Sequence, residues 1–157
     1  MTREEQFMQQ AINIGLEGMR NNVGGPFGCV IVKDNKIIGK GCNSVIASND
    51  PTAHAEVVAI REACKTLGSF QLEDCEVYTT CEPCPMCMGA LYWARPKKIY
   101  YANSKADAAA IGFDDSFIYE EFGLPINERK MSMEYLHHAE AIKMFEEWKK
   151  MNNKTLY

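Results

Sequence analysis

The first twenty residues carry apolar side chains at the spacing of an amphipathic helix. Apolar residues recur every three or four positions across 7–19, and Thr2 with Glu5 forms the pattern of a capping box at the start. The stretch 24–28 interrupts this spacing, and its three glycines in five residues predict a tight turn with close backbone approach. We therefore expect a helix that runs to about Arg20 and is followed by a turn.

Further along, short apolar runs with strand character alternate with stretches of helical spacing. The apolar runs predict a hairpin, two more strands and a short fifth strand: 29–32, 37–42, 76–80, 98–102 and 131–135. Helical spacing with starting or terminating residues predicts further helices from His54 to Gly68, from Cys84 to Arg95, at 106–110, at 115–122 and at 138–150. Strands interleaved with helices predict an α/β layer fold.

The last helical stretch places Ile142, Phe145 and Trp148 on one face and charged residues on the other. We expect this apolar face to be buried. The chain has 157 residues, of which 46% are hydrophobic, so it is long and apolar enough for one domain with an ordinary core. It shows no repeat, low-complexity tract or linker.

The net charge, the hydropathy and the cysteine count indicate which partners and which cellular compartment to expect. The formal net charge is −4, whereas proteins that grip nucleic acid usually present a basic face, so no nucleic-acid partner is expected. No apolar run approaches the roughly 18 residues that span a membrane, so no membrane partner is expected either. The chain has seven cysteines, an odd number, and its first residues resemble a helix rather than a signal peptide. We therefore expect reduced thiols and a cytoplasmic location.

Two short motifs carry the chemistry. His54 and Glu56 form H-x-E, and Pro83, Cys84 and Cys87 form P-C-x-x-C. Imidazole and two thiolates are good zinc ligands, and a catalytic zinc site keeps a fourth position open for water. Together the two motifs are the known signature of zinc deaminases. A metal brings the pKa of bound water to about 7, and Glu56 is placed to take that proton and return it to the ring nitrogen and the leaving amine.

Two other metal sites share these residues. Cys81, Cys84 and Cys87 also read as C-x2-C-x2-C, which is similar to an iron–sulfur run, but position 91, where a fourth cysteine belongs, is Leu91. The second alternative is a binding module with purely structural zinc. It would use Cys81 as a fourth protein ligand and leave no open coordination position.

Motifs spread over nearly the whole chain resemble one family. They are G-G-P-F-G-x-V-I-V at 24–32, N-D-P-T-A-H-A-E at 49–56, C-E-P-C-P-M-C at 81–87, Y-W-A-R-P at 92–96 and G-F-D-D-S-F-I-Y at 112–119, with the terminal Tyr157. The chain resembles the cytidine deaminase-like superfamily and, within it, the small bacterial guanine deaminases. This implies a three-layer α/β/α fold with a five-stranded mixed sheet, and a single zinc deaminase domain over 1–157. It also implies one zinc per subunit and a homodimer, in which the segment at about 130–157 is a candidate for exchange between subunits.

The resemblance also implies two groups of site residues. The first binds metal and moves protons: His54, Cys84, Cys87 and Glu56. The second forms the pocket for a nucleobase: Asn43, Phe27, Ala55, Asp115 and Tyr157. Asn43 would donate to a purine acceptor, Phe27 would stack on the base, and the Ala55 N–H would hold the ring edge. Asp115 is counted with the catalytic residues as well, although Asp114 beside it is an alternative.

Each pocket residue also has a plainer structural interpretation. The alternatives are core packing for Phe27, a turn role for Asn43, a helix cap for Asp114 and Asp115, and a chain terminus for Tyr157.

Two enzymatic functions remain. The implied reaction is hydrolysis of guanine to xanthine and ammonia, in purine breakdown or salvage. Guanine presents the donors N1–H and N2 amine, so its pocket needs an acceptor such as Asp115, which would reject bases that lack the ring N–H. The competing function is deamination of tRNA adenosine or of another nucleobase or nucleoside. An RNA enzyme would need a basic surface.

Overall fold

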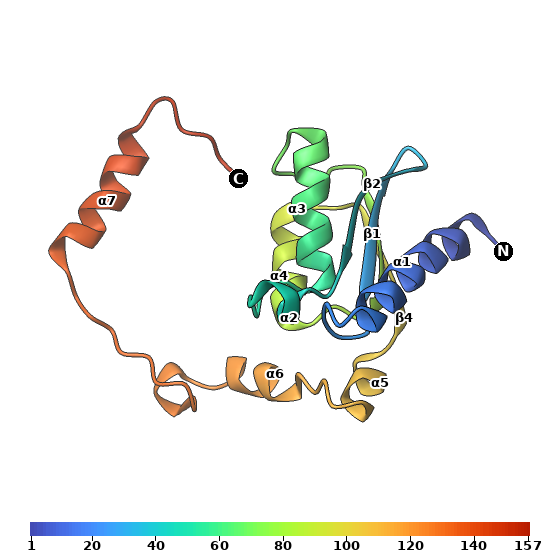
Figure 1. Ribbon diagram of the computed structural model, residues 1–157. Helices are drawn as coiled ribbons and strands as arrows, with labels where there is room; N and C mark the ends of the chain where they lie inside the picture. Colours follow the sequence, from blue (N-terminus) through green and yellow to red (C-terminus); the bar gives the residue numbers. More distant parts are fainter. The chain divides into compact units, whose positions relative to one another are not determined.

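The computed structural model describes all 157 residues and divides them into two compact units, 1–116 and 117–157. The N-terminal unit holds a four-stranded sheet in the order β2-β1-β3-β4 (Figure 1). Its strands are β1 (Gly28–Lys33), β2 (Lys36–Cys42), β3 (Glu76–Cys81) and β4 (Lys98–Asn103). β1 is antiparallel to both β2 and β3, whereas β3 and β4 are parallel, so the sheet is mixed as predicted.

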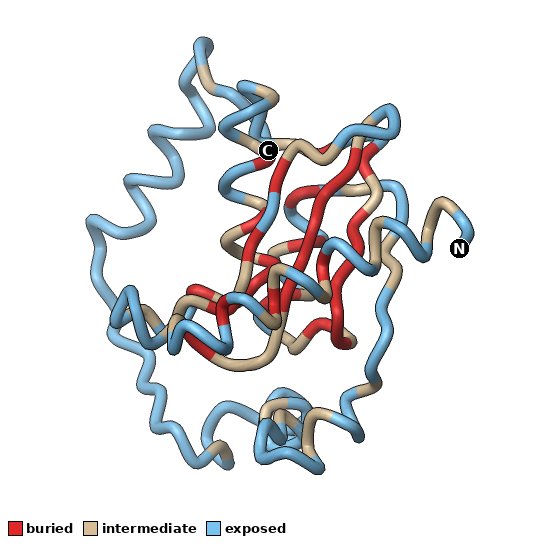
Figure 2. The backbone as a smooth tube through the Cα atoms, turned by 45° about the vertical axis from the view of Figure 1, so that its right-hand side comes forward, coloured by how far each residue is buried: buried red, intermediate tan, exposed pale blue.

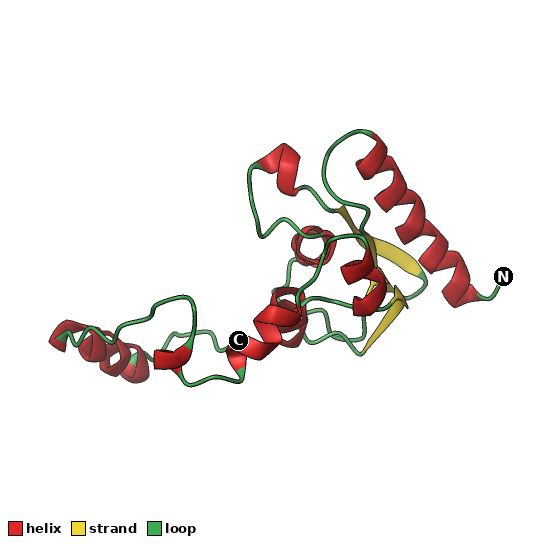
Figure 3. Ribbon diagram, turned by 90° about the horizontal axis from the view of Figure 1, so that it is seen from below, coloured by secondary structure: helices red, strands yellow, loops and turns green.

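Helices cover both faces of this sheet. α1 (Arg3–Arg20) lies on one face, and α3 (Ala55–Leu67) and α4 (Pro85–Ala94) lie on the other (Figure 3). Successive side chains of β3 point to opposite faces of the sheet. Tyr78 packs in a buried cluster with Ala11 of α1, whereas its neighbour Val77 packs in a cluster with Ala55 of α3. Buried residues follow the strands and the helices beside them (Figure 2).

The helix boundaries follow from the residues that start and end them. The predicted capping box at Thr2 and Glu5 is present, and Gly68 ends α3 in the left-handed conformation at φ 62°. α1 approaches the sheet so closely that a Cβ atom at Gly28 would collide with the Ala11 carbonyl, which explains the glycine at this position. Arg3 fixes the start of this helix through a 2.8 Å ion pair to Glu76 on β3. The first helix, the hairpin and the next two strands are thus confirmed.

Three expectations from the sequence were wrong. The sheet has four strands and not five, because 131–135 forms no regular structure and has no neighbouring strand to pair with. Residues 44–50, for which the sequence predicts neither a strand nor a helix, include the short helix α2 (Val45–Ser48). The apolar face of the last helix is exposed and not buried, with Ile142, Phe145 and Trp148 at 56%, 66% and 43% exposure.

The remaining elements are short, apart from the last helix. α5 (Lys105–Ala110) belongs to the N-terminal unit, and the C-terminal unit contains α6 (Ser116–Phe122, which begins at the boundary), a 3-10 turn (Ile126–Glu128) and α7 (Ala139–Lys150). No residue after position 116 is buried. None of the helices combines the length and the apolar character needed to cross a bilayer.

Candidate metal centre and base pocket

The topology brings the two sequence motifs to one edge of the sheet. Because β1 is antiparallel to both of its neighbours, β2, β3 and β4 all run in the same direction. α3 follows β2, with the short α2 between them, and α4 follows β3, so both helices begin on the side of the sheet where these strands end. Sites in α/β sheets commonly lie outside the carboxyl ends of the strands. His54 and Cys84, 30 residues apart, meet there.

Each of these helices begins at a predicted ligand. His54 is the N-cap of α3 and Cys84 is the N-cap of α4, both with extended backbone. Pro85 takes the first helical position, where its missing N–H costs nothing. The Cys84 sulfur accepts the Cys87 N–H at 3.5 Å. The free N–H groups and the positive dipole end of α4 therefore stabilise a thiolate at this place.

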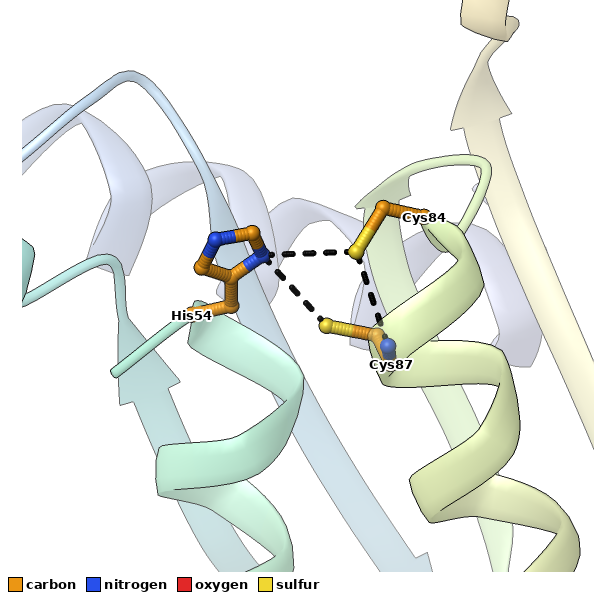
Figure 4. A group of neighbouring side chains, drawn as sticks. All are labelled: His54, Cys84 and Cys87. Carbon is orange, nitrogen blue, oxygen red and sulfur yellow. Dashed lines mark hydrogen bonds between the residues drawn. The ribbon is translucent and has the colours of Figure 1, made fainter. Parts of the chain in front are cut away.

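The three donor atoms stand at the distances that a tetrahedral metal requires. His54 Nδ1 lies 3.5 Å from Cys84 Sγ and 3.5 Å from Cys87 Sγ (Figure 4). All three atoms lie within 4.8 Å of one another. Zinc bonds of about 2.3 Å to sulfur and about 2.0 Å to nitrogen, at tetrahedral angles, also place the nitrogen and the sulfur about 3.5 Å apart. The residues fit zinc in both chemistry and spacing.

Hydrogen bonds among the three ligand side chains favour the negative charge on Cys84 that a cation would bind. The Cys87 thiol donates to the Cys84 sulfur and His54 adds a second hydrogen bond, which together lower the pKa of Cys84 to about 4. The same donation, with burial, raises the pKa of Cys87. The hydrogen bond to Cys84 raises the pKa of His54. Zinc binds deprotonated ligands, so it would replace the shared protons.

Cys81 does not join this group. Its sulfur lies 3.7 Å from the Ser104 carbonyl, to which it donates, and burial raises the pKa of its thiol to about 11. The cluster therefore has three protein ligands rather than four. A three-ligand set is typical of catalytic zinc, whereas structural zinc is usually closed by a fourth side chain. This arrangement supports neither the structural-zinc module nor the iron–sulfur alternative.

Glu56 lies in the first turn of α3, two residues after the ligand His54. It is the second residue of α3, only 6% exposed, and its Oε1 accepts a 2.8 Å hydrogen bond from the Thr79 hydroxyl. The carboxylate also contacts the Cys87 thiol. Thr79 was missed by sequence reasoning, because a threonine in a strand is ordinary. Its position two residues after the buried Val77 is the signal that places it on the α3 face.

Asn43 has a fixed orientation beside the glycine-rich turn. It is 6% exposed, and its Oδ1 accepts the backbone N–H groups of Gly25 at 3.3 Å and Val45 at 3.2 Å. With the oxygen occupied, the amide nitrogen is the atom left to donate to a ligand. Phe27, which precedes β1, makes an edge-to-face contact with Phe113 at 4.9 Å between ring centroids.

The adjacent aspartates have different surroundings. Asp114 is exposed, and its Oδ1 accepts the Ser116 N–H at 2.9 Å, as a capping residue does. Asp115 is half-buried. Burial and the negative charge of the Cys84 sulfur raise the pKa of Asp115. Asp115 is therefore the more buried of the two carboxyl groups, and its role in a base pocket stays a prediction.

The two remaining residues of the predicted base pocket are Ala55 and Tyr157. Ala55 is buried at the first position of α3, where its N–H has no acceptor within the helix. Tyr157 belongs to the C-terminal unit and is 71% exposed. Its place at the pocket stays a prediction.

Comparison with known families agrees with this site. Residues 1–103 match the model of the cytidine and deoxycytidylate deaminase zinc-binding region, a span that includes the three ligands and Glu56. The chain belongs to this family. Zinc is therefore the metal of the His54, Cys84 and Cys87 cluster.

Relatives of this zinc-binding deaminase extend the match past residue 103. Guanine deaminase from Bacillus subtilis is 54% identical over 153 residues and 98% of each chain. Its X-ray structure matches 98% of both chains with a TM-score of 0.95. A tRNA-specific adenosine deaminase from Aquifex aeolicus is 38% identical over 133 residues, covering 83% of this chain and 85% of the relative. A structure of guanine deaminase from Nitrosomonas europaea is 29% identical, with a TM-score of 0.65, and covers 69% of this chain and 63% of that chain.

Zinc content distinguishes ligands from neighbours. We expect the purified protein to hold about one zinc per chain and Cys84→Ser to lose nearly all of it, because a neutral hydroxyl is a poor substitute for a thiolate. Cys81→Ser is the matched control and should keep its zinc, since Cys81 binds the Ser104 carbonyl instead. Elemental analysis of folded protein measures both. Equal loss in the two variants would mean that Cys81 is a ligand.

Proposed function

We propose that this chain is a zinc-dependent hydrolase that deaminates guanine to xanthine and ammonia. The observation that carries the proposal is a three-ligand cluster with a buried carboxylate, Glu56, held beside it. The relative named guanine deaminase, which matches 98% of the chain, supports the choice of base because the match includes the pocket segment around Asp115.

The proton chemistry falls to Glu56. A bound zinc ion supplies Lewis acidity, which makes water a better acid at neutral pH. Glu56 stands beside the cluster, so its carboxylate accepts one proton as water adds to C2 of guanine and passes it to the ring nitrogen; it then carries the second proton of the water to the departing amine as the C2 carbonyl forms. Guanine and water then become xanthine and ammonia, and Glu56 ends the cycle as it began.

The pocket groups match the edges of guanine. The Asn43 amide nitrogen and the Ala55 N–H are donors, which suit the acceptor atoms of the purine. Asp115 is an acceptor, which suits the N1–H and N2 amine. Phe27 offers a flat apolar surface for stacking. Adenine and cytosine carry an amine without the adjacent ring N–H, so they would leave part of the Asp115 carboxylate without a donor.

A tRNA adenosine deaminase is the second candidate, because the Aquifex aeolicus relative shares 38% identity with this chain. The acidic balance of the chain, net charge −4, argues against it, since phosphate binding needs a concentration of lysine and arginine.

We also propose that the complete molecule is a homodimer in which the segment at about 130–157 is exchanged. The C-terminal unit has no buried residue, yet it carries large apolar side chains at Met131, Tyr135, Leu136, Ile142, Met144, Phe145 and Trp148. Exposed apolar surface of this extent is characteristic of an interface. The N-terminal unit also exposes Tyr92 and Trp93, at 75% and 64%. A second copy of the chain would cover both surfaces, and we propose that residues 1–157 serve as a single zinc deaminase domain.

We also infer that the reaction serves purine breakdown or salvage in the cytoplasm. All seven cysteines are free thiols, as expected of a protein in a reducing compartment.

Turnover tests the proton role of Glu56 and the substrate together. We expect ammonia release from guanine, and far less from adenine, cytosine, their nucleosides or a tRNA anticodon stem-loop. Glu56→Gln should keep zinc and fold but lose about 10²–10⁴-fold in kcat, because the amide cannot carry the proton. Near wild-type turnover by Glu56→Gln would refute the mechanism, and preference for the stem-loop would favour the RNA enzyme.

The pocket carboxylate is tested by two adjacent substitutions. Asp115→Asn should lower kcat/KM for guanine by about 10–100-fold, because it removes a charged acceptor from two donors. Zinc content should not change. Asp114→Asn is the matched control, since Asp114 only receives the Ser116 N–H, and it should retain most of the activity. The reverse order would move the pocket role to Asp114. Equal loss on every substrate would indicate a folding role for Asp115.

The dimer is tested on the full chain. Light scattering should give twice the chain mass, and Phe145→Glu should shift the protein towards monomer because it places a charge on the apolar face of α7. Glu147→Lys changes the opposite face and should leave the mass unchanged. A wild-type protein that is monomeric at micromolar concentration would contradict the proposal.

A further inference from the structure

Thr79 is a buried polar residue in an otherwise apolar layer. It lies in the middle of the sheet, paired with Cys29 on β1 and Tyr101 on β4, and it is 1% exposed. Val77, which shares its face, packs in a cluster with Ala55 and Ala59 of α3. Valine has nearly the same shape as threonine and suits a strand interior. Packing alone therefore does not explain a hydroxyl at this position.

The hydroxyl has one evident use. Burying a hydroxyl group costs free energy unless it makes a hydrogen bond, and the Thr79 Oγ1 donates to Glu56 Oε1 at 2.8 Å. A glutamate side chain has three rotatable bonds, and the carboxylate group can turn either oxygen towards the site. A donor placed on one oxygen removes much of that freedom, because the bond to a carboxylate is stronger than one between neutral groups.

We propose that Thr79 is a positioning residue that holds Glu56 Oε1, so that Oε2 is the oxygen that exchanges protons with water and base. The inference rests on the proposed role of Glu56. While Oε1 accepts the hydrogen bond from the Thr79 hydroxyl, it cannot accept a proton from water in the same direction. The carboxylate also contacts the Cys87 thiol and keeps a 6% exposed fraction, so it remains within reach of the site.

The neighbouring residue provides a matched control. Thr80 is also buried, at 6% exposure, but it lies on the opposite face of β3, where its hydroxyl accepts the Gly28 N–H at 3.1 Å. Thr79→Val and Thr80→Val thus make the same change at adjacent positions, and each removes one buried hydrogen bond. Only the first of these bonds ends on Glu56.

The experiment compares kcat, KM, zinc content and melting temperature in these variants. We expect Thr79→Val to lower kcat by about 10–100-fold, the size expected of a misplaced catalytic group, with KM and zinc content nearly unchanged. Thr79→Ser, which keeps the hydroxyl, should recover most of kcat. Thr80→Val should lower the melting temperature without this loss of kcat. If Thr79→Val does not fold, Thr79→Ala takes its place with the same expectation.

A second measurement does not depend on activity. Thr79→Val should lower the melting temperature when Glu56 is present, but this drop should disappear in a Glu56→Ala background, where the hydroxyl has lost its acceptor. Equal drops in both backgrounds would overturn the inference, as would a kcat of Thr79→Val close to wild type. Loss of turnover in Glu56→Gln alongside normal Thr79→Val would reject only the role of Thr79. Normal turnover in Glu56→Gln would reject the proposed mechanism itself.

Discussion

The meeting of two helix N-termini at one edge of the sheet is the constraint on which the site depends. Each helix presents a ligand at its N-cap, and the unpaired N–H groups of the first turn favour the charged form of a thiolate. A shift of one helix along its axis by a single turn, about 5.4 Å, would separate Cys84 from His54. The packing of α3 and α4 on the same face of the sheet therefore determines whether metal chemistry is available at all.

Much of the N-terminal unit was predictable, because its patterns are local and mutually consistent. The capping box at Thr2, the glycine that ends α3 and the spacing of the two cysteines each depend on residues within one turn of helix. The roles of Thr79 and Cys81 were not predictable in the same way. Both are ordinary strand residues in the sequence, and only the register of β3 shows that one contacts Glu56 and the other the Ser104 carbonyl.

The C-terminal unit shows the limit of periodicity. The amphipathic pattern of 138–150 correctly predicted a helix, α7, but its apolar face has no cover within the unit. A hydrophobic stripe indicates that a surface will be buried, and it does not indicate which surface will cover it. The apolar run at 131–135 likewise resembled a strand but lacked a partner for its backbone groups, which is what a strand needs.

Asn43 joins recognition to folding. Its carboxamide oxygen accepts the backbone N–H groups of Gly25 and Val45 and so links two segments of the chain, while its nitrogen remains available to donate to a ligand. A residue employed twice in this way is hard to exchange, since any replacement must satisfy the turn before it can alter the pocket. The Asp115 carboxylate, by contrast, accepts a backbone hydrogen bond only from its own residue and joins no second segment of the chain. Base preference in enzymes built on this framework should accordingly diverge on the Asp115 side of the ring and stay constant on the Asn43 side.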